Sequence, residues 1–179
     1  MKSPIRTLFL VALAVCASTP AWCQASTGKD PAVFASTVLT SDTGQKVRLS
    51  DLRGKVVFLN YWGAWCPPCR EEMASIRTMQ TKLQDRANAI EYLFVSIKDD
   101  WFDRDAAKFR ELGMAGHAYR WEPRSDAQWH TFFGNPPGKT SFFVPTTYVL
   151  DPSGNIAMMR AQTTAWEVHT DEVRALFPH

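Results

Sequence analysis

Two cysteines separated by two prolines, Cys66-Pro67-Pro68-Cys69, carry the residue types best suited to covalent chemistry in this chain of 179 residues. A helical spacing of apolar residues begins directly after Pro67, so the pair is expected at the N-terminus of a helix. The free N–H groups and the helix dipole at such a position favour a thiolate. Cys66 would therefore act as the nucleophile, and Cys69 would resolve the mixed disulfide by intramolecular displacement.

The proline pair limits how strongly that thiolate is stabilised. Neither Pro67 nor Pro68 has a backbone N–H, so only the amides of Cys69 and later residues remain to hold the Cys66 sulfur. We therefore expect the pKa of the Cys66 thiol to be lowered only modestly. Strong oxidants owe their power to a stabilised reduced form, so this dithiol is predicted to be a reductant.

Other uses of two closely spaced cysteines fit the sequence less well. A zinc site needs four ligands, but no second cysteine pair follows, and the histidines have no ligand spacing (His117, His130, His169 and His179). A c-type haem would need histidine where Arg70 stands. A purely structural disulfide would close a very short loop and constrain the unfolded chain little. We expect a redox-active dithiol with no metal and no cofactor.

The first 25 residues have the features of a secretory signal peptide. Lys2 and Arg6 precede an apolar run over residues 8–15, which is shorter than the about 20 residues of a membrane span. An uncleaved anchor is the alternative, and a lipoprotein signal at Cys16 fits less well because Val15 is bulky. Cleavage would remove two of the four cysteines, and two of the 20 Lys+Arg but no acid, which leaves 18 against 18 Asp+Glu.

The predicted mature chain begins with a leader over residues 26–33 and continues as one domain over residues 34–179. Its neutral net charge provides no basic field for nucleic acid, so no nucleic-acid partner is expected. The signal peptide predicts a periplasmic location, with a membrane contact only if that segment stays uncleaved.

Hydrophobic periodicity and turn residues predict an α/β fold. The expected order is a hairpin (34–40 and 45–49), a strand (55–61), a helix from residue 67, a strand (90–97), a helix (103–112), a short helix (126–133), two strands (146–150 and 155–160) and a closing helix (167–177). Strands that alternate with helices before a final hairpin imply a mixed central sheet flanked by helices.

Two segments carry a resemblance to a known family: residues 49–73 read LSDLRGKVVFLNYWGAWCPPCREEM, and residues 144–151 read VPTTYVLD, followed by Gly154. Both are similar to the TlpA/ResA branch of exported thioredoxin-like thiol:disulfide oxidoreductases. The segments occur in the expected order, and the resemblance covers about residues 34–177. It implies a thioredoxin-like fold with an N-terminal β-hairpin extension.

The resemblance also implies roles for residues around the dithiol. In the family, the proline matching Pro145 is cis and faces the dithiol, and the residue matching Val144 offers backbone groups to an extended substrate. A glutamate three residues after the second cysteine matches Glu72, which would relay a proton to Cys69. The alternative is that Glu72 only stabilises the first turn of the helix. Thioredoxins proper have a buried Asp where this chain has Asn60.

Aromatic and proline side chains are expected to form the surface that meets the substrate. Trp65, Pro67 and Pro68 are placed there, whereas Trp62 fits the core equally well. Four phenylalanines near Pro145 would either form a hydrophobic rim for a protein partner or fill the core (Phe132, Phe133, Phe142 and Phe143).

The family resemblance implies a substrate class and an electron source. We expect reduction of disulfides in cysteine-containing exported proteins, for example in cytochrome c maturation, with electrons from a membrane thiol reductase. The alternatives are a thiol oxidase or isomerase, a thiol peroxidase and a copper metallochaperone. A peroxidase of the peroxiredoxin kind needs Thr and Pro upstream of a single cysteine, and a metallochaperone would display Cys-x-x-x-Cys with a later histidine. The motif at residues 66–69 matches neither.

Overall fold

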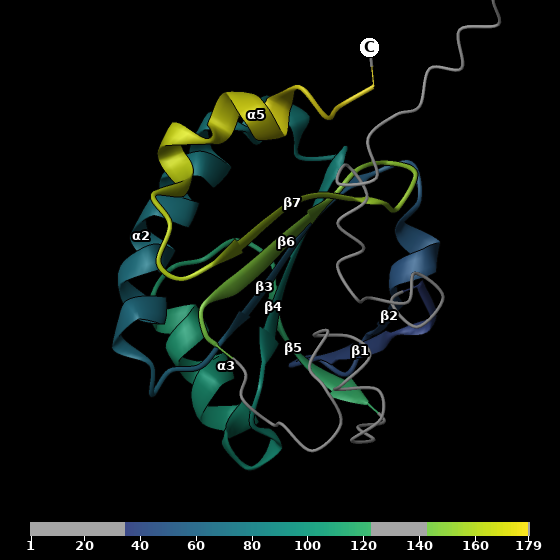
Figure 1. Ribbon diagram of the computed structural model, residues 1–179. Helices are drawn as coiled ribbons and strands as arrows, with labels where there is room; N and C mark the ends of the chain where they lie inside the picture. Colours follow the sequence, from purple (N-terminus) through teal and green to yellow (C-terminus); the bar gives the residue numbers. More distant parts are fainter. Residues whose placement is uncertain (1–34, 123–142, 179) are drawn as a thin grey trace, which may run out of the picture.

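A computed structural model describes residues 35–122 and 143–178 (Figure 1). Within these ranges, strands form one seven-stranded sheet in the order β2-β1-β5-β4-β3-β6-β7. The strands are β1 (Val38–Ser41), β2 (Lys46–Arg48), β3 (Val56–Trp62), β4 (Ile90–Ser96), β5 (His117–Glu122), β6 (Thr146–Leu150) and β7 (Ile156–Ala161). The helices are α2 (Pro67–Lys82), α3 (Phe102–Glu111) and α5 (Thr170–Arg174), with 3₁₀ turns at Leu49–Leu52, Gln84–Arg86, Asp99–Trp101 and Trp166–Val168. This is the mixed α/β architecture that the sequence predicts.

β3 lies inside the sheet and leads directly to the two cysteines. It pairs parallel with β4 and antiparallel with β6, and all of its residues are buried. Val56, Phe58 and Trp62 pack on the face that the helices cover, whereas Leu59 and Tyr61 pack on the other face. Burial on both faces explains the continuous apolar run of this strand.

In the described chain, α2, α3 and α5 lie on one face of the sheet (Figure 1). α2 buries Met73, Ile76 and Met79, which confirms the predicted helical spacing of its apolar residues. α3 adds Phe102 and Phe109 to the same apolar cluster. This packing fixes α2, and with it the cysteines at its start, against the sheet.

β1 and β2 form an antiparallel pair at one edge of the sheet. Their register pairs Val38 with Arg48 and Thr40 with Lys46. β1 also pairs antiparallel with β5, so these two strands extend the central sheet instead of standing apart from it.

The element order predicted from the sequence lacks one strand, β5, which lies between β1 and β4. Ala118, Tyr119 and Trp121 are buried in this strand. His117 and Arg120 interrupt the apolar pattern, and the expected alternation is therefore obscured. The strand is recognisable only once its neighbours on both sides are known.

The closing helix predicted over residues 167–177 is wrong in its extent. The structure has a 3₁₀ turn at Trp166–Val168, followed by the short helix α5. Trp166 is tied to α2, because its backbone N–H donates to Ser75 Oγ at 3.0 Å and its indole N–H donates to Glu72 at 2.8 Å. These bonds fix the turn independently of the helix that follows.

Several predictions fall outside the described residues and stay predictions. They are the signal peptide (1–25), the leader (26–33) and the short helix (126–133). Among the residues that the structure does describe, no helix combines the length and the apolar character needed to cross a membrane.

Candidate active site

The two cysteines form a disulfide at the junction of β3 and α2. Cys66 is the N-cap of α2 and Pro67 is its first residue, and the Cα atoms of the two cysteines are 5.3 Å apart. The backbone N–H of Cys69 donates to Cys66 Sγ at 3.2 Å. Since the intervening prolines have no N–H, this amide is the first helical donor available to the sulfur, as the sequence predicts.

The two cysteines differ in their access to solvent. Cys69 is fully buried, and Cys66 keeps 3% of its surface exposed. Pro67 and Pro68, between them, are both exposed. An incoming sulfur therefore has its better approach at Cys66. The roles of nucleophile and resolving thiol stay predictions.

A cis-proline loop faces the disulfide. The Val144–Pro145 peptide bond is cis, as the family resemblance predicts, and Cys66 Sγ lies 3.8 Å from the carbonyl oxygen of Val144. The N–H of Gln162 donates to the Pro145 carbonyl at 2.9 Å and anchors the loop to the end of β7. The fold thus brings together the dithiol and the loop expected to hold an extended substrate.

Glu72 lies one turn beyond Cys69 on α2 and is 1% exposed. Its carboxylate accepts N–H bonds from the Trp166 indole at 2.8 Å, from the Thr164 backbone at 3.1 Å and from Asn60 Nδ2 at 3.3 Å. Burial raises the pKa of the Glu72 carboxyl to about 7, and the three hydrogen bonds partly oppose that rise. A carboxyl with this pKa can take up or release a proton near neutral pH.

The surroundings of Glu72 disfavour a role in helix capping. α2 has no acidic residue in its first turn, because Glu72 comes later and points into the core. Asn60 connects it to β6, since Asn60 Nδ2 also donates to Thr147 Oγ1 at 2.8 Å. A buried polar network therefore extends from the dithiol helix to the strand that follows the cis-proline. Proton relay to Cys69 stays a prediction.

Trp65 is partly buried and held by contacts on several sides. It meets Trp101 edge-on with ring centroids 6.2 Å apart, and Lys98 Nζ is 4.7 Å from its ring centroid. A Cβ at Gly63 would lie only 2.3 Å from Trp65 Nε1, so glycine leaves the space that the indole occupies. Trp62 is fully buried in the core.

Comparison with known proteins identifies the family to which this site belongs. A model of the AhpC/TSA family matches residues 31–159, which is more than half of the chain. The chain belongs to the AhpC/TSA family. The match includes both segments that carry the resemblance described from the sequence.

Relatives of this AhpC/TSA-family chain carry the name thiol-disulfide oxidoreductase ResA. The protein from Geobacillus thermodenitrificans is 27% identical over 179 residues, which cover 97% of this chain and 95% of that relative. The protein from Bacillus thuringiensis is 45% identical over 49 residues, 27% of this chain. That second match spans only 28% of the relative's own length. These relatives confirm the ResA-like resemblance.

A solved structure confirms the fold of this AhpC/TSA-family chain. The thioredoxin domain of a thiol-disulfide oxidoreductase from Bacteroides vulgatus superimposes with a TM-score of 0.58 at 16% identity, covering 78% of this chain and 94% of that domain. The fold is therefore thioredoxin-like.

Three residues that the fold of this AhpC/TSA-family chain places around the dithiol were not predicted from the sequence. Thr164 and Trp166 bind Glu72 from more than 90 residues away, and no local spacing could link them to it. Asp105 is fully buried on α3 and accepts an N–H bond from Ala64. Its position on the apolar face of the predicted helix, three residues after Phe102, is a signal that could have identified it.

The predicted hydrophobic rim is described only in part. Phe143, directly before Val144, is 75% exposed, as a rim residue would be. The other three phenylalanines lie outside the described residues (Phe132, Phe133 and Phe142). The rim therefore stays a prediction.

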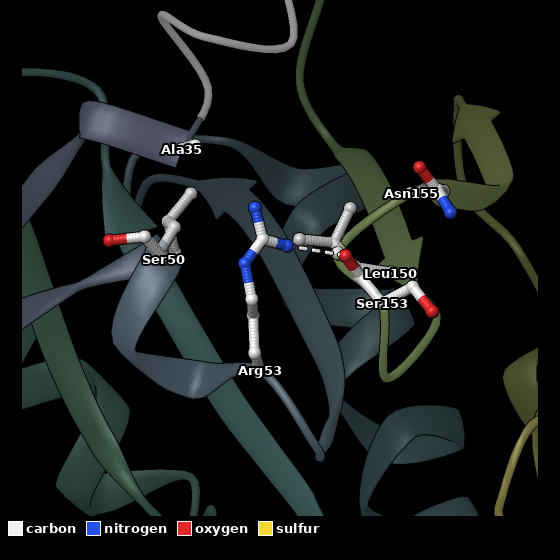
Figure 2. A pocket seen from close by; sticks show the side chains of 8 residues that line it. Ala35, Ser50, Arg53, Leu150, Ser153 and Asn155 are labelled. Carbon is white, nitrogen blue, oxygen red and sulfur yellow. Dashed lines mark hydrogen bonds between the residues drawn. The ribbon is translucent and has the colours of Figure 1, made fainter.

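A separate pocket, which Figure 2 shows from close by, has Leu150 in its lining. Leu150 pairs with Val57, so the pocket lies at the opposite end of β3 and β6 from the disulfide. It has a volume of about 80 Å³ and lies between the 3₁₀ turn Leu49–Leu52 and the turn that joins β6 to β7. Arg53 Nη1 donates to the Ser153 carbonyl across it. No cysteine lines this pocket. No cluster of three metal-ligating side chains occurs in the described ranges.

Proposed function

We propose that this chain is a thiol:disulfide oxidoreductase that reduces disulfides in cysteine-containing exported proteins. The observation that carries the proposal is the Cys66–Cys69 disulfide at the start of α2, with Cys66 Sγ 3.8 Å from the Val144 carbonyl beside the cis-proline. A two-cysteine site at a helix N-terminus is suited to thiol exchange. The ResA name of its relatives supports the same chemistry.

The reaction consumes the reduced dithiol and one substrate disulfide. The Cys66 thiolate attacks a substrate sulfur, so that a mixed disulfide forms and the first substrate thiolate leaves. The Cys69 thiolate then attacks Cys66 Sγ, which forms the Cys66–Cys69 disulfide and releases the second substrate thiolate. Two electrons pass from the dithiol to the substrate, and the two substrate thiolates take up the protons that the dithiol loses.

Glu72 is proposed to take the proton of Cys69 before the second step. It lies on the same helix one turn further on, and burial raises the pKa of its carboxyl to about 7. As a carboxylate it would accept the Cys69 proton, and as an acid it would return a proton to a departing thiolate. Its three N–H partners keep the carboxylate in one orientation.

The proline pair supports the reducing direction. Pro67 and Pro68 offer no N–H to the Cys66 sulfur, and the Cys69 amide at 3.2 Å is the helical donor that reaches it. A thiolate with few donors is stabilised only modestly, and a reduced form that is not strongly stabilised gives its electrons away readily.

The location and the partners are proposed from the sequence. The segment over residues 1–25 would direct the chain to the periplasm, where a membrane thiol reductase would return electrons to the disulfide. The clients would be exported proteins whose cysteines must stay reduced, such as apocytochromes before haem attachment. Trp65, Pro67 and Pro68, together with Val144 and Pro145, are proposed to contact the client.

The reduction potential of the Cys66–Cys69 pair, measured against glutathione, tests the proposal. A value near that of thioredoxin, about −270 mV, is expected for a reductant. A value near about −120 mV would instead identify a thiol oxidase. Peroxide consumption by a Cys69→Ser variant would identify a peroxidase, and stoichiometric copper binding by the reduced protein would identify a metallochaperone.

A further inference from the structure

Asp105 is a buried carboxylate that the proposed thiol chemistry does not use. It is 0% exposed, its Oδ1 accepts the backbone N–H of Ala64 at 2.7 Å, and its Oδ2 accepts the hydroxyl of Ser96. Ser96 ends β4, and Ala64 lies in the loop between β3 and Cys66. One side chain of α3 therefore joins a strand end to the loop that carries the dithiol.

The residue Ala64 is held on its other side by α2. Arg70 Nη1 donates to the Ala64 carbonyl at 2.7 Å. The N–H of Cys66 donates to the Gly63 carbonyl at 3.0 Å, which closes a tight turn. The N–H of Ala64 is thus bonded to a residue of α3, and its C=O is bonded to a residue of α2.

The residue after Ala64 is Trp65, and its ring depends on this geometry. The indole occupies the space where a Cβ at Gly63 would stand, 2.3 Å from Nε1, and it meets Trp101 just before α3. A change in the backbone torsions at Ala64 would move the ring out of that space. Fixing Ala64 therefore fixes the indole next to Cys66.

We infer that Asp105 is a positioning residue for disulfide exchange: by accepting the Ala64 N–H, it holds Trp65 where a protein substrate meets Cys66. The inference rests on the proposed function, because it assigns Asp105 to the substrate-binding side of the same site. The position requires an acceptor oxygen, which an asparagine also supplies. An asparagine Nδ2 could donate to Ser96 Oγ, whose own proton is within reach of the Lys98 carbonyl at 3.2 Å.

The kinetic test compares three variants on α3 with insulin as the protein disulfide. Asp105→Ala is expected to raise KM about fivefold while kcat changes less than about twofold, which corresponds to one lost hydrogen bond. Asp105→Asn is expected to stay within about twofold of the wild type in both. Ala106→Gly weakens the same helix without touching the loop, and its KM is expected to be unchanged.

Two further measurements separate positioning from general destabilisation. In a Trp65→Ala background, Asp105→Ala is expected to have no additional effect on KM, because the two residues act in series. Hydrogen exchange of the Ala64 amide is expected to be at least about tenfold faster in Asp105→Ala and unchanged in Asp105→Asn and Ala106→Gly. Additive KM effects, or an Ala64 exchange rate that Asp105→Ala leaves unchanged, would overturn the inference.

A further variant keeps the test informative if Asp105→Ala does not fold. Arg70 is exposed, so Arg70→Met removes the bond to the Ala64 carbonyl at little cost in stability, and KM is expected to rise about twofold to threefold. An unchanged KM in this variant would overturn the inference. If the wild type reduces no disulfide at all, the proposed function fails, while the Ala64 exchange rates still decide whether Asp105 holds the loop.

Discussion

Glu72 on α2 and Asp105 on α3 are both almost fully buried, but their carboxylates bind different kinds of partner. Glu72 accepts N–H bonds from two side chains and one backbone amide. Asp105 accepts one N–H from the loop before Cys66 and one hydroxyl from Ser96. Burial raises the pKa of both carboxyls above their ordinary values.

The difference suggests a division of labour around the dithiol. Glu72 lies on the same helix as Cys69, and its three N–H partners hold its carboxylate in one orientation. Asp105 binds the backbone that leads to Cys66, so its contribution is geometric. Similar burial can therefore serve proton transfer in one place and positioning in another, and the partners distinguish the two cases.

The largest effect is expected from removing the nucleophile, because neither carboxylate can then influence a reaction. Cys66→Ser should lower disulfide exchange by about 1,000-fold or more, as measured by insulin reduction. Variants of Glu72 or Asp105 should then have no further effect. The matched variant Cys69→Ser should instead accumulate a mixed disulfide with the substrate, visible by mass spectrometry. Equal residual activity in both variants would contradict the assignment of Cys66 as the attacking sulfur.

Stability as a function of pH should identify Glu72 in the oxidised protein. Because burial raises the pKa of its carboxyl from 4.5 to about 7, the folded state holds a proton that the unfolded state releases between these values. The free energy of unfolding should therefore fall as pH rises from 4.5 to 7, by about 3 kcal/mol. Urea unfolding of Glu72→Gln should lack this decrease. Glu71→Gln, on the exposed side of α2, should retain it; identical curves for the two variants would contradict the attribution.

The rate of the second chemical step should separate the two carboxylates directly. Glu72→Gln should slow the attack of Cys69 on the mixed disulfide about tenfold at pH 7, because the thiol must then lose its proton to water. Asp105→Asn, which keeps the acceptor oxygen, should change this rate less than about twofold. Single-turnover kinetics with a preformed mixed disulfide measures the step. An equal fall of this rate in both variants would contradict the assignment of proton transfer to Glu72 and of positioning to Asp105.

The smallest effect is expected from Trp166→Phe, which deletes the shortest of the three bonds to Glu72. This bond favours the carboxylate, so its loss should raise the pKa of Glu72 further. The pH midpoint of the Cys69 step should move up by about half a unit to one unit. Trp62→Phe is a matched control, because the indole N–H of Trp62 makes no hydrogen bond within the described residues. The midpoint should stay in place in that variant.

The sequence predicts much of this fold because its strongest signals are local. The apolar run of β3, the helical spacing of α2 and the proline pair all follow from neighbouring residues, and together they place the dithiol at a helix N-terminus. The cis bond before Pro145 has no local signal that separates it from a trans bond, and only the family resemblance predicted it.

The partners of the two buried carboxylates could not be predicted in the same way. Trp166 and Glu72 are 94 residues apart in the chain, so their contact depends on how the end of β7 returns to α2. Asp105 did leave a local trace, a charged residue on the apolar face of α3. The strand β5 was missed for the opposite reason, since His117 and Arg120 masked a segment that is largely buried.

The Trp65 indole occupies the space where a side chain at residue 63 would lie, and this limits which residues can occur at the two positions. With 2.3 Å between a Cβ at residue 63 and the Trp65 Nε1, no larger residue fits at position 63 while the indole stays where it is. Substitutions at residues 63 and 65 should therefore occur together. If both were randomised in one library and selected for function, tryptophan at 65 should be recovered only with glycine at 63, and other pairs should combine a side chain at 63 with a smaller residue at 65.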